Sequence, residues 1–164
     1  MLVSWQSGAM QGNSILVSIV FPMTEIMKQP RILIVEDDPN ICDLIKLTLD
    51  NGDYRLSTAT GGREALQKIS DEKPDLVVLD ILMPEPDGWD VYAELRRNPE
   101  LASTRVIILT ALPVKPEVFV KKNLLPKDRF MRKPFDLEDL RSTVRVLLEP
   151  NSHEMRPDAA QANG

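Results

Sequence analysis

The sequence predicts an α/β protein with one doubly wound, five-stranded parallel sheet and helices on both faces. Five short β-like runs alternate with helical patterns, and strands that alternate with helices form βαβ units with a parallel sheet. Three runs are apolar throughout, at residues 32–35, 76–79 and 106–109, as expected of strands that are covered on both faces. The five expected strands are residues 31–36, 54–59, 75–80, 105–110 and 129–133.

The two remaining runs set the strand order. Residues 54–59 and 129–133 alternate polar and apolar side chains, which is typical of edge strands, so they should flank a centre made of the other three. With right-handed crossovers, this gives the strand order 2-1-3-4-5 of a flavodoxin-like sheet.

Two helices have recognisable starts. Asp38 can cap a helix with Pro39 at its first position. Asp136 can cap the last helix, where Asp139 stands at the third position of a capping box. The helical spacing of apolar residues predicts a buried stripe on each helix. These stripes are Ile41, Leu44, Ile45 and Leu49 in the first helix, and Leu137, Leu140, Val144 and Leu148 in the last.

Length and composition fit one globular domain. The chain has 164 residues, of which 43% are hydrophobic. We expect a poorly ordered leader (1–29), the folded domain (30–149) and a disordered tail (150–164) that holds the single histidine, His153. The net charge of -5 argues against nucleic acid or a membrane surface as a partner. The apolar stretch 14–21 is too short to span a bilayer, and no Lys or Arg precedes it as in a signal peptide.

The single cysteine, Cys42, excludes an internal disulfide and fits a reducing compartment, so we expect a cytoplasmic protein. With one cysteine and one histidine, a structural zinc site is disfavoured. Any bound metal should therefore be a hard cation that is held by oxygen atoms.

Acidic residues gather where the first and third expected strands end. Glu36 and Asp37 follow the first strand and Asp80 ends the third, and open parallel sheets bind ligands at the carboxyl ends of their strands. Two carboxylates about 4 Å apart repel each other by roughly 1 kcal/mol in water and about 4 kcal/mol at an effective dielectric of 20. Only protonation or a cation relieves this repulsion, and Mg²⁺ is the cation that takes carboxylates, waters and a phosphate oxygen.

The fourth and fifth strands bring further groups to the same rim. Thr110 supplies a hydroxyl and Lys133 an ammonium group, which together with a metal and a carboxylate form a receptor for a phosphoryl group. Asp80, the carboxylate without another obvious partner, can act as a nucleophile and form an aspartyl phosphate. The turn that follows, with Pro84 and Gly88, holds Asp80 at the mouth of the site.

At these residues the chain resembles the receiver domain of two-component response regulators, over residues 30–149. The motifs that carry the resemblance are ILIVEDDP (32–39), LDILMPEPDG (79–88), ILTA (108–111) and KPF (133–135). Their spacing is also family-like, with 43 residues from Asp37 to Asp80 and 30 from Asp80 to Thr110.

The resemblance implies a phosphoacceptor function. Asp80 would take a phosphoryl group from a phosphohistidine on a histidine kinase or a histidine phosphotransfer protein. Asp37 would bind Mg²⁺ directly, Glu36 would act mainly through a bound water, and the Leu82 carbonyl would be a third ligand; Mn²⁺ would substitute for Mg²⁺. Lys133 would pair with a phosphoryl oxygen.

The resemblance also implies a switch. Thr110 would move towards the phosphoryl oxygens and Phe130 would turn inward, which changes the surface of the fourth helix, fifth strand and fifth helix for a downstream protein target. It allows a homodimer, and it implies a cis peptide bond between Lys133 and Pro134.

Two features depart from the family pattern. The region 111–132 carries Pro113, Pro116 and Pro126, so the fourth helix should be short, within residues 116–125. The residues two positions after Asp80 and after Thr110 are Leu82 and Leu112. Neither side chain can orient an attacking water, so we expect slow self-dephosphorylation.

The favoured interpretation is a stand-alone receiver that binds a partner or relays phosphate, not an enzyme that acts on a separate substrate. Two alternatives remain. A degenerate receiver would act as a phosphorylation-independent protein-binding scaffold, which the intact set of acidic residues, Thr110 and Lys133 argues against. A Mg²⁺-dependent phosphohydrolase would carry its nucleophilic Asp after the first strand, whereas here Asp80 follows the third.

Overall fold

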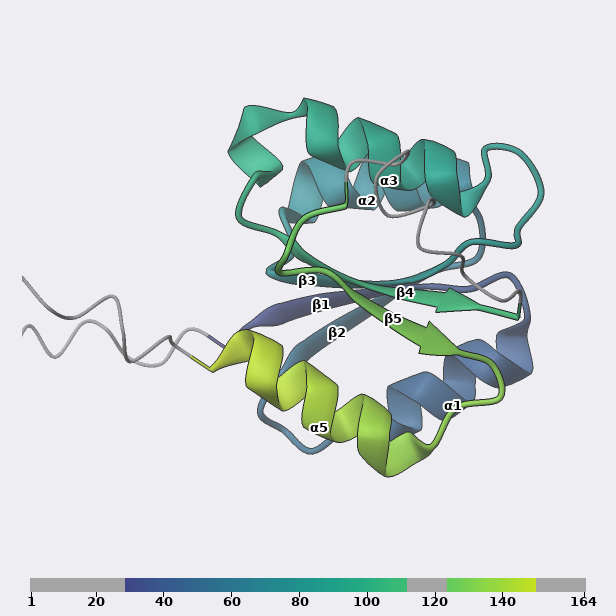
Figure 1. The fold of residues 1–164 in the computed structure, drawn as a ribbon, viewed down its shortest axis with the longest axis vertical. Helices are drawn as coiled ribbons and strands as arrows, with labels where there is room; N and C mark the ends of the chain where they lie inside the picture. Colours follow the sequence, from purple (N-terminus) through teal and green to yellow (C-terminus); the bar gives the residue numbers. More distant parts are fainter. Residues whose placement is uncertain (1–28, 112–123, 150–164) are drawn as a thin grey trace, which may run out of the picture.

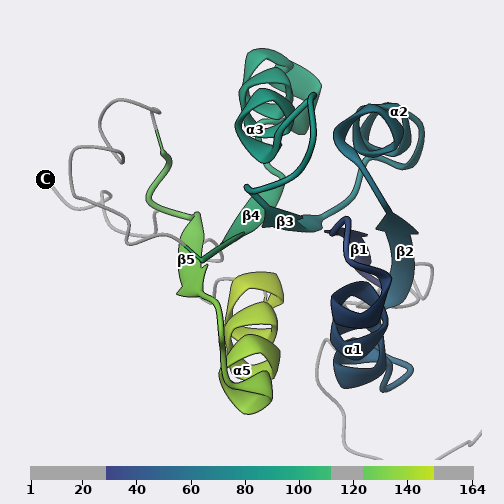
Figure 2. The ribbon, with the colours of Figure 1, turned by 90° about the vertical axis from the view of Figure 1, so that its right-hand side faces the viewer.

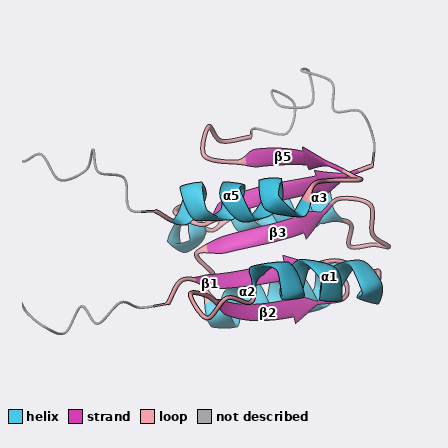
Figure 3. Ribbon diagram, turned by 90° about the horizontal axis from the view of Figure 1, so that it is seen from below, coloured by secondary structure: helices cyan, strands magenta, loops and turns pink. Residues whose placement is uncertain are grey.

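The computed structural model describes residues 29–111 and 124–149 and contains one parallel five-stranded sheet in the order β2-β1-β3-β4-β5 (Figure 1). The strands are β1 (Arg31–Val35), β2 (Arg55–Ala59), β3 (Leu76–Asp80), β4 (Arg105–Thr110) and β5 (Arg129–Arg132). The predicted strand order is confirmed, and each strand begins and ends within one residue of its predicted bounds. All strand arrows point to the same edge of the sheet (Figure 3), so the residues that follow β1, β3, β4 and β5 meet there.

Helices cover both faces of the sheet, as predicted. One face carries α1 (Pro39–Leu49) and α5 (Leu137–Leu148), and the other carries α2 (Gly62–Glu72) and α3 (Gly88–Arg97) (Figure 2). A short 3-10 helix, η1 (Pro99–Leu101), connects α3 to β4. Within the described part of the chain, no helix is both long enough and apolar enough to cross a membrane.

Several sequence predictions fall outside the described residues. Residues 1–28, which include nearly all of the predicted leader and the stretch 14–21, lie outside the described residues. The predicted tail with His153, residues 150–164, also lies outside them. Leu112 and nearly all of the predicted fourth helix lie in the range 112–123, which is likewise outside.

The core consists of two apolar layers, one on each side of the sheet. Successive side chains of β1 point to opposite faces of the sheet and so contribute to both layers. Ile32 and Ile34 pack with α1 and α5, while Leu33 and Val35 pack with α2 and α3. The central strands β1, β3 and β4 are buried almost throughout, as their apolar runs predict.

The predicted helix caps agree with the structure better than the predicted buried stripes do. Asp38 and Asp136 cap α1 and α5 through backbone amides two or three residues ahead, and the reciprocal capping box is found in α3, between Asp87 and Asp90. The prediction that Leu44 is buried was wrong, since its side chain is 44% exposed. It lies about 100° around the helix from Ile45. The buried stripe of α1 consists of Cys42, Ile45, Thr48 and Leu49.

The stripe of α5 also differs in part from the prediction. Leu140 and Val144 are buried as expected, but Leu137 and Leu148 are only partly buried. Leu147 takes the inward position at the end of the helix.

Candidate functional site

Three carboxylates meet at the carboxyl edge of the sheet. Glu36 and Asp37 follow β1, and Asp80 ends β3, which pairs directly with β1. Each of the three offers an oxygen within 4.8 Å of the others. Glu36 and Asp80 are 1% and 4% exposed, whereas Asp37 is exposed. The predicted convergence of these acids is therefore present, with one acid facing solvent and two beneath it.

Lys133 joins the two buried carboxylates. Its Nζ donates hydrogen bonds of 2.7 Å to an oxygen of Asp80 and of 2.7 Å to an oxygen of Glu36. The residue directly follows β5, and the peptide bond to Pro134 is cis, as predicted. The expectation that Asp80 lacks another partner was wrong, because a cation from a strand two positions away in the sheet reaches it. We call Glu36, Asp37, Asp80 and Lys133 the carboxylate site.

The backbone around Asp80 leaves little freedom. The Leu82 amide donates to the second Asp80 oxygen at 3.0 Å, so both oxygens of this side chain have partners. The turn then folds back tightly, since a Cβ on Gly88 would lie 2.1 Å from the Asp80 carbonyl oxygen. Only glycine fits this approach without a backbone shift, which explains why α3 begins with Gly88.

A second glycine fixes the outer side of the same turn. A Cβ on Gly62, at the start of α2, would lie 2.0 Å from the carbonyl oxygen of Pro86. The turn between β3 and α3 is thus held between the end of its own strand and the start of α2. Leu82 stands on this turn with its side chain 46% exposed.

The other predicted site residues lie on the neighbouring strands. Thr110 is the buried last residue of β4, and its carbonyl oxygen accepts a 2.8 Å hydrogen bond from the Lys133 amide. Phe130 is partly buried and packs on the apolar layer beneath α2 and α3. The structure thus groups Glu36, Asp37, Asp80 and Lys133, with Thr110 beside them on β4.

Burial and charge act on the ionisable groups together. Burial raises the pKa of Glu36, and the nearby Asp80 charge adds to this, against the opposing hydrogen bond from Lys133. For Lys133, burial alone would lower the pKa, but the hydrogen bonds that it donates to Asp80 and Glu36 outweigh this effect, and the pKa is raised. Lys133 therefore stays an ammonium ion, and this one cation is shared among three acidic groups.

The donor set suits a hard cation. It consists of carboxylate oxygens, and Mg²⁺ prefers oxygen ligands at about 2.0–2.1 Å, so two directly bound oxygens lie at most about 4.2 Å apart. A cluster that spans up to 4.8 Å fits the ion when one carboxylate acts through a water molecule. Electrostatics also favours a bound cation here, because the acidic groups outnumber the one lysine.

Sequence reasoning missed the bond between Lys133 and Glu36. The two residues are 97 positions apart, and the expected partner of Lys133 was a phosphoryl oxygen, not Glu36. The strand order does contain the signal, because a long side chain after β5 can reach across the shorter groups at the ends of β4 and β3.

Comparisons with known proteins agree with this geometry. The family model "Response regulator receiver domain" matches residues 32–145. The chain is 36% identical over 119 residues to the DNA-binding dual master transcriptional regulator RpaA of Synechocystis, which covers 73% of this chain and 49% of that protein. It is 36% identical over 135 residues to the alkaline phosphatase synthesis transcriptional regulatory protein PhoP of Bacillus subtilis, covering 78% and 54%. The chain thus spans about half the length of these relatives.

Solved structures agree as well. A putative response regulator from Chloroflexus aurantiacus aligns with a TM-score of 0.66 at 28% identity, covering 75% of this chain and 100% of that one. The Vibrio cholerae chemotaxis protein CheY4 aligns with a TM-score of 0.66 at 28% identity, covering 73% and 99%.

Proposed function

This chain belongs to the response regulator receiver family, and we propose that it accepts a phosphoryl group on Asp80 from a phosphohistidine of a partner protein. The family is a signalling module of two-component systems rather than a true enzyme. The observation that carries the proposal is the arrangement at Asp80, where one carboxylate is bonded to a lysine and lies within 4.8 Å of two further acids.

The transfer is a displacement at phosphorus. An Asp80 oxygen forms the new O–P bond, the P–N bond of the phosphohistidine breaks, and its electron pair stays on the imidazole nitrogen, which takes up a proton. Asp80 suits this role because both of its oxygens are held in place before the reaction, one by Lys133 and the other by the Leu82 amide. Lys133 then pairs with a phosphoryl oxygen in place of the carboxylate oxygen.

Asp37, Glu36 through a water molecule, and the Leu82 carbonyl would hold Mg²⁺, or Mn²⁺ in its place, together with Asp80. When bound, the ion supplies positive charge that offsets the charge on the transferred phosphoryl group. Asp37 is the exposed acid of the site, so it can receive the ion from solvent. The partner that supplies the phosphoryl group would be a histidine kinase or a histidine phosphotransfer protein.

The output of this reaction would be a change in partner binding. Thr110 lies at the end of β4 beside Lys133, and its hydroxyl would move towards the new phosphoryl group. Phe130 is only partly buried on β5, so it has room to turn inward as Thr110 moves. The new charge on Asp80 would thus alter the surface around β5 and α5 that a downstream protein reads.

Intact mass tests the proposal directly. The purified chain is incubated with phosphoramidate, with and without Mg²⁺, as wild type, Asp80→Asn and Asp38→Asn. The last variant is the matched control, because it removes the acidic group next to Asp37 in the sequence while asparagine still caps α1. We expect one Mg²⁺-dependent phosphoryl group on the wild type and on Asp38→Asn, and none on Asp80→Asn. Folded wild-type protein that binds Mg²⁺ but gains no mass would favour a phosphorylation-independent scaffold.

A further inference from the structure

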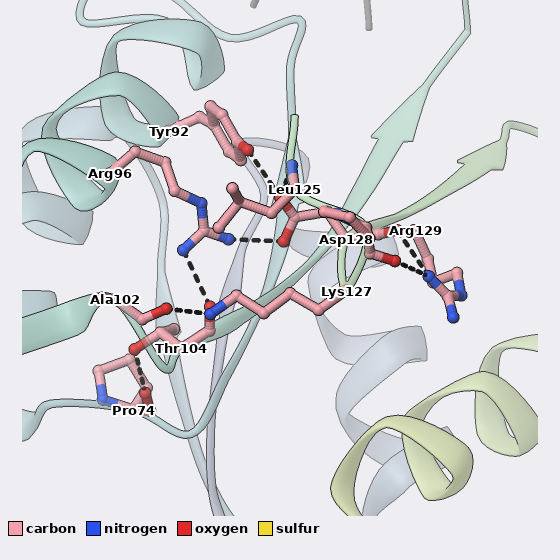
Figure 4. Close-up of polar contacts among 10 residues, drawn as sticks. Pro74, Tyr92, Arg96, Ala102, Thr104, Leu125, Lys127, Asp128 and Arg129 are labelled. Carbon is pink, nitrogen blue, oxygen red and sulfur yellow. Dashed lines mark hydrogen bonds and ion pairs between the residues drawn. The ribbon is translucent and has the colours of Figure 1, made fainter. Parts of the chain in front are cut away.

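A third buried carboxylate, that of Asp128, lies immediately before β5, away from the carboxylate site. Asp128 accepts hydrogen bonds from the Tyr92 hydroxyl at 2.6 Å, from the Arg96 guanidinium at 2.5 Å and from the Leu125 amide at 3.0 Å (Figure 4). Its side chain is 1% exposed. We call Tyr92, Arg96, Asp128 and the Leu125 amide the Asp128 cluster.

The cluster joins β5 to elements that are fixed independently. Tyr92 and Arg96 stand on α3, and Arg96 also donates to the Thr104 carbonyl at 2.9 Å, directly before β4. The Arg96 guanidinium lies 5.0 Å from the centre of the Tyr92 ring, which holds both side chains in one arrangement. Asp128 closes its own turn as well, because its amide donates to the Leu125 carbonyl at 2.9 Å. The start of β5 is therefore attached to α3 and to the entry of β4.

Strand β5 has few other features that fix its register. Among the residues that the structure describes, it is an edge strand of four residues whose one pairing partner is β4, from Ile107 opposite Arg129 to Thr110 opposite Arg132. Its inward residues, Phe130 and Met131, are only partly buried. Register is weakly specified where burial is weak, and a slip of two residues would keep the faces but move the chain by about 6.6 Å.

Such a slip would remove Lys133 from its partners. Lys133 stands five residues after Asp128 and makes two hydrogen bonds of 2.7 Å, to Asp80 and Glu36. These bonds tolerate displacements of a few tenths of an ångström, since hydrogen bonds of this kind weaken beyond about 3.2 Å. The position of the ammonium group thus depends on where β5 is held at its other end.

We propose that Asp128 is a positioning residue for Lys133: its buried bonds to Tyr92 and Arg96 fix the register of β5, and thereby the placement of the lysine at Asp80 and Glu36. The consequence for phosphoryl uptake rests on the proposed function, whereas the consequence for the register of β5 does not.

Amide hydrogen exchange tests the register in the resting protein. The Lys133 amide, bonded to the Thr110 carbonyl at 2.8 Å, reports on the end of β5. In Asp128→Asn, an NH2 group replaces one of the two accepting oxygens and meets another donor, either the Arg96 guanidinium or the Leu125 amide, and the ion pair with Arg96 is lost. We expect the Lys133 amide to exchange about tenfold faster, beyond any change in the slowest amides of β1 and β3.

Thr104→Val is the matched control. It removes the buried bond from the Thr104 hydroxyl to the Pro74 carbonyl at 2.9 Å, near the same end of the sheet, but keeps the Thr104 carbonyl that Arg96 contacts. We expect it to speed exchange of all core amides by a similar factor, with no excess at Lys133. Equal effects of both variants on β5 and on the core would overturn the proposal.

Tyr92→Phe keeps the experiment decisive if Asp128→Asn does not fold. It removes one of the three bonds to Asp128 and leaves the ring in place, so we expect a smaller excess at Lys133, about threefold. No excess in this variant would count against the proposal.

Phosphoryl uptake from phosphoramidate is measured on the same samples at saturating Mg²⁺. We expect uptake to slow several-fold in Asp128→Asn and to be unchanged in Thr104→Val. A register effect in exchange together with no uptake by any variant, wild type included, would reject the proposed function and leave the role of Asp128 in place. Uptake at the wild-type rate despite a displaced Lys133 would overturn the link to Asp80.

Discussion

The carboxylate site and the Asp128 cluster are built from the same chemical parts but in different proportions. Each contains a buried aspartate bonded to a cation that comes from a distant element. At the carboxylate site, one lysine faces three acids, so the acidic groups outnumber the cation. In the Asp128 cluster, one arginine faces one acid, and a phenol and a backbone amide supply the remaining bonds.

The two clusters show how a binding site differs from a structural ion pair. A buried acid whose bonds and charge are satisfied internally has no need of a ligand, and Asp128 is of this kind. Acids that exceed their cations destabilise the fold until a ligand arrives. Exposure of Asp37 beside buried Glu36 and Asp80 shows that the excess charge is also reachable from solvent.

Removing the cation from each cluster should have the largest effect on stability. Arg96→Met leaves the buried Asp128 without its cation, and we expect a loss of about 3 kcal/mol in the free energy of unfolding. Lys133→Met should cost less, about 2 kcal/mol, because Glu36 can relieve the charge by taking up a proton. Urea denaturation with and without 10 mM Mg²⁺ measures both.

Mg²⁺ distinguishes the two variants. It should restore most of the loss in Lys133→Met, because the ion replaces the missing positive charge, and none of the loss in Arg96→Met beyond the gain seen in wild type. Equal restoration in both variants would show that the excess charge at the carboxylate site has no special consequence.

Neutralising one acid in each cluster should change stability in opposite directions. In metal-free buffer, Glu36→Gln should stabilise the protein by about 1 kcal/mol, since it removes a repulsion from Asp80, whereas Asp128→Asn should destabilise it. In the presence of Mg²⁺ the advantage of Glu36→Gln should vanish, because a ligand of the ion is lost. The midpoints of thermal unfolding, measured with EDTA and with Mg²⁺, show whether each variant is more or less stable than wild type.

The same contrast should appear in the pH dependence. The pKa of Glu36 is raised in the folded protein by burial and by Asp80, so its contribution to stability is full below the unfolded pKa of about 4.3 and is lost as pH rises through the folded pKa. Metal-free wild type should therefore lose stability relative to Glu36→Gln from about pH 4.3 upwards. A stability difference that is constant between pH 4 and pH 7 would contradict the assignment.

The carboxylate site could be predicted from the sequence, whereas the Asp128 cluster could not. Strand order could be derived because apolar runs mark central strands, and the order alone brings Glu36, Asp37, Asp80 and Lys133 to one edge. The Asp128 cluster could not be derived, since its residues do not follow the carboxyl ends of the strands, and nothing in the local sequence shows that an aspartate after Pro126 and Lys127 turns inward. The predicted burial of Leu44 was wrong because helical spacing defines the buried stripe only to within about one position.

Leu82 lies beside the carboxylate site, and its substitution should change the rate of dephosphorylation with little effect on stability. Its side chain is 46% exposed beside Asp80 and cannot hydrogen-bond a water, so Leu82→Gln should speed loss of the phosphoryl group from Asp80 by about tenfold, through an oriented attacking water. Stability should change by less than about 0.5 kcal/mol, as for other exposed positions. Leu47→Gln on α1, at a position that is 75% exposed, is the control for lost apolar surface and should leave the rate unchanged. Intact mass followed over time after removal of the donor measures both variants. If Leu82→Gln released phosphate no faster than Leu47→Gln, the apolar neighbour would not be what makes the phosphorylated state persist, and the buried position of Asp80 itself would have to account for it.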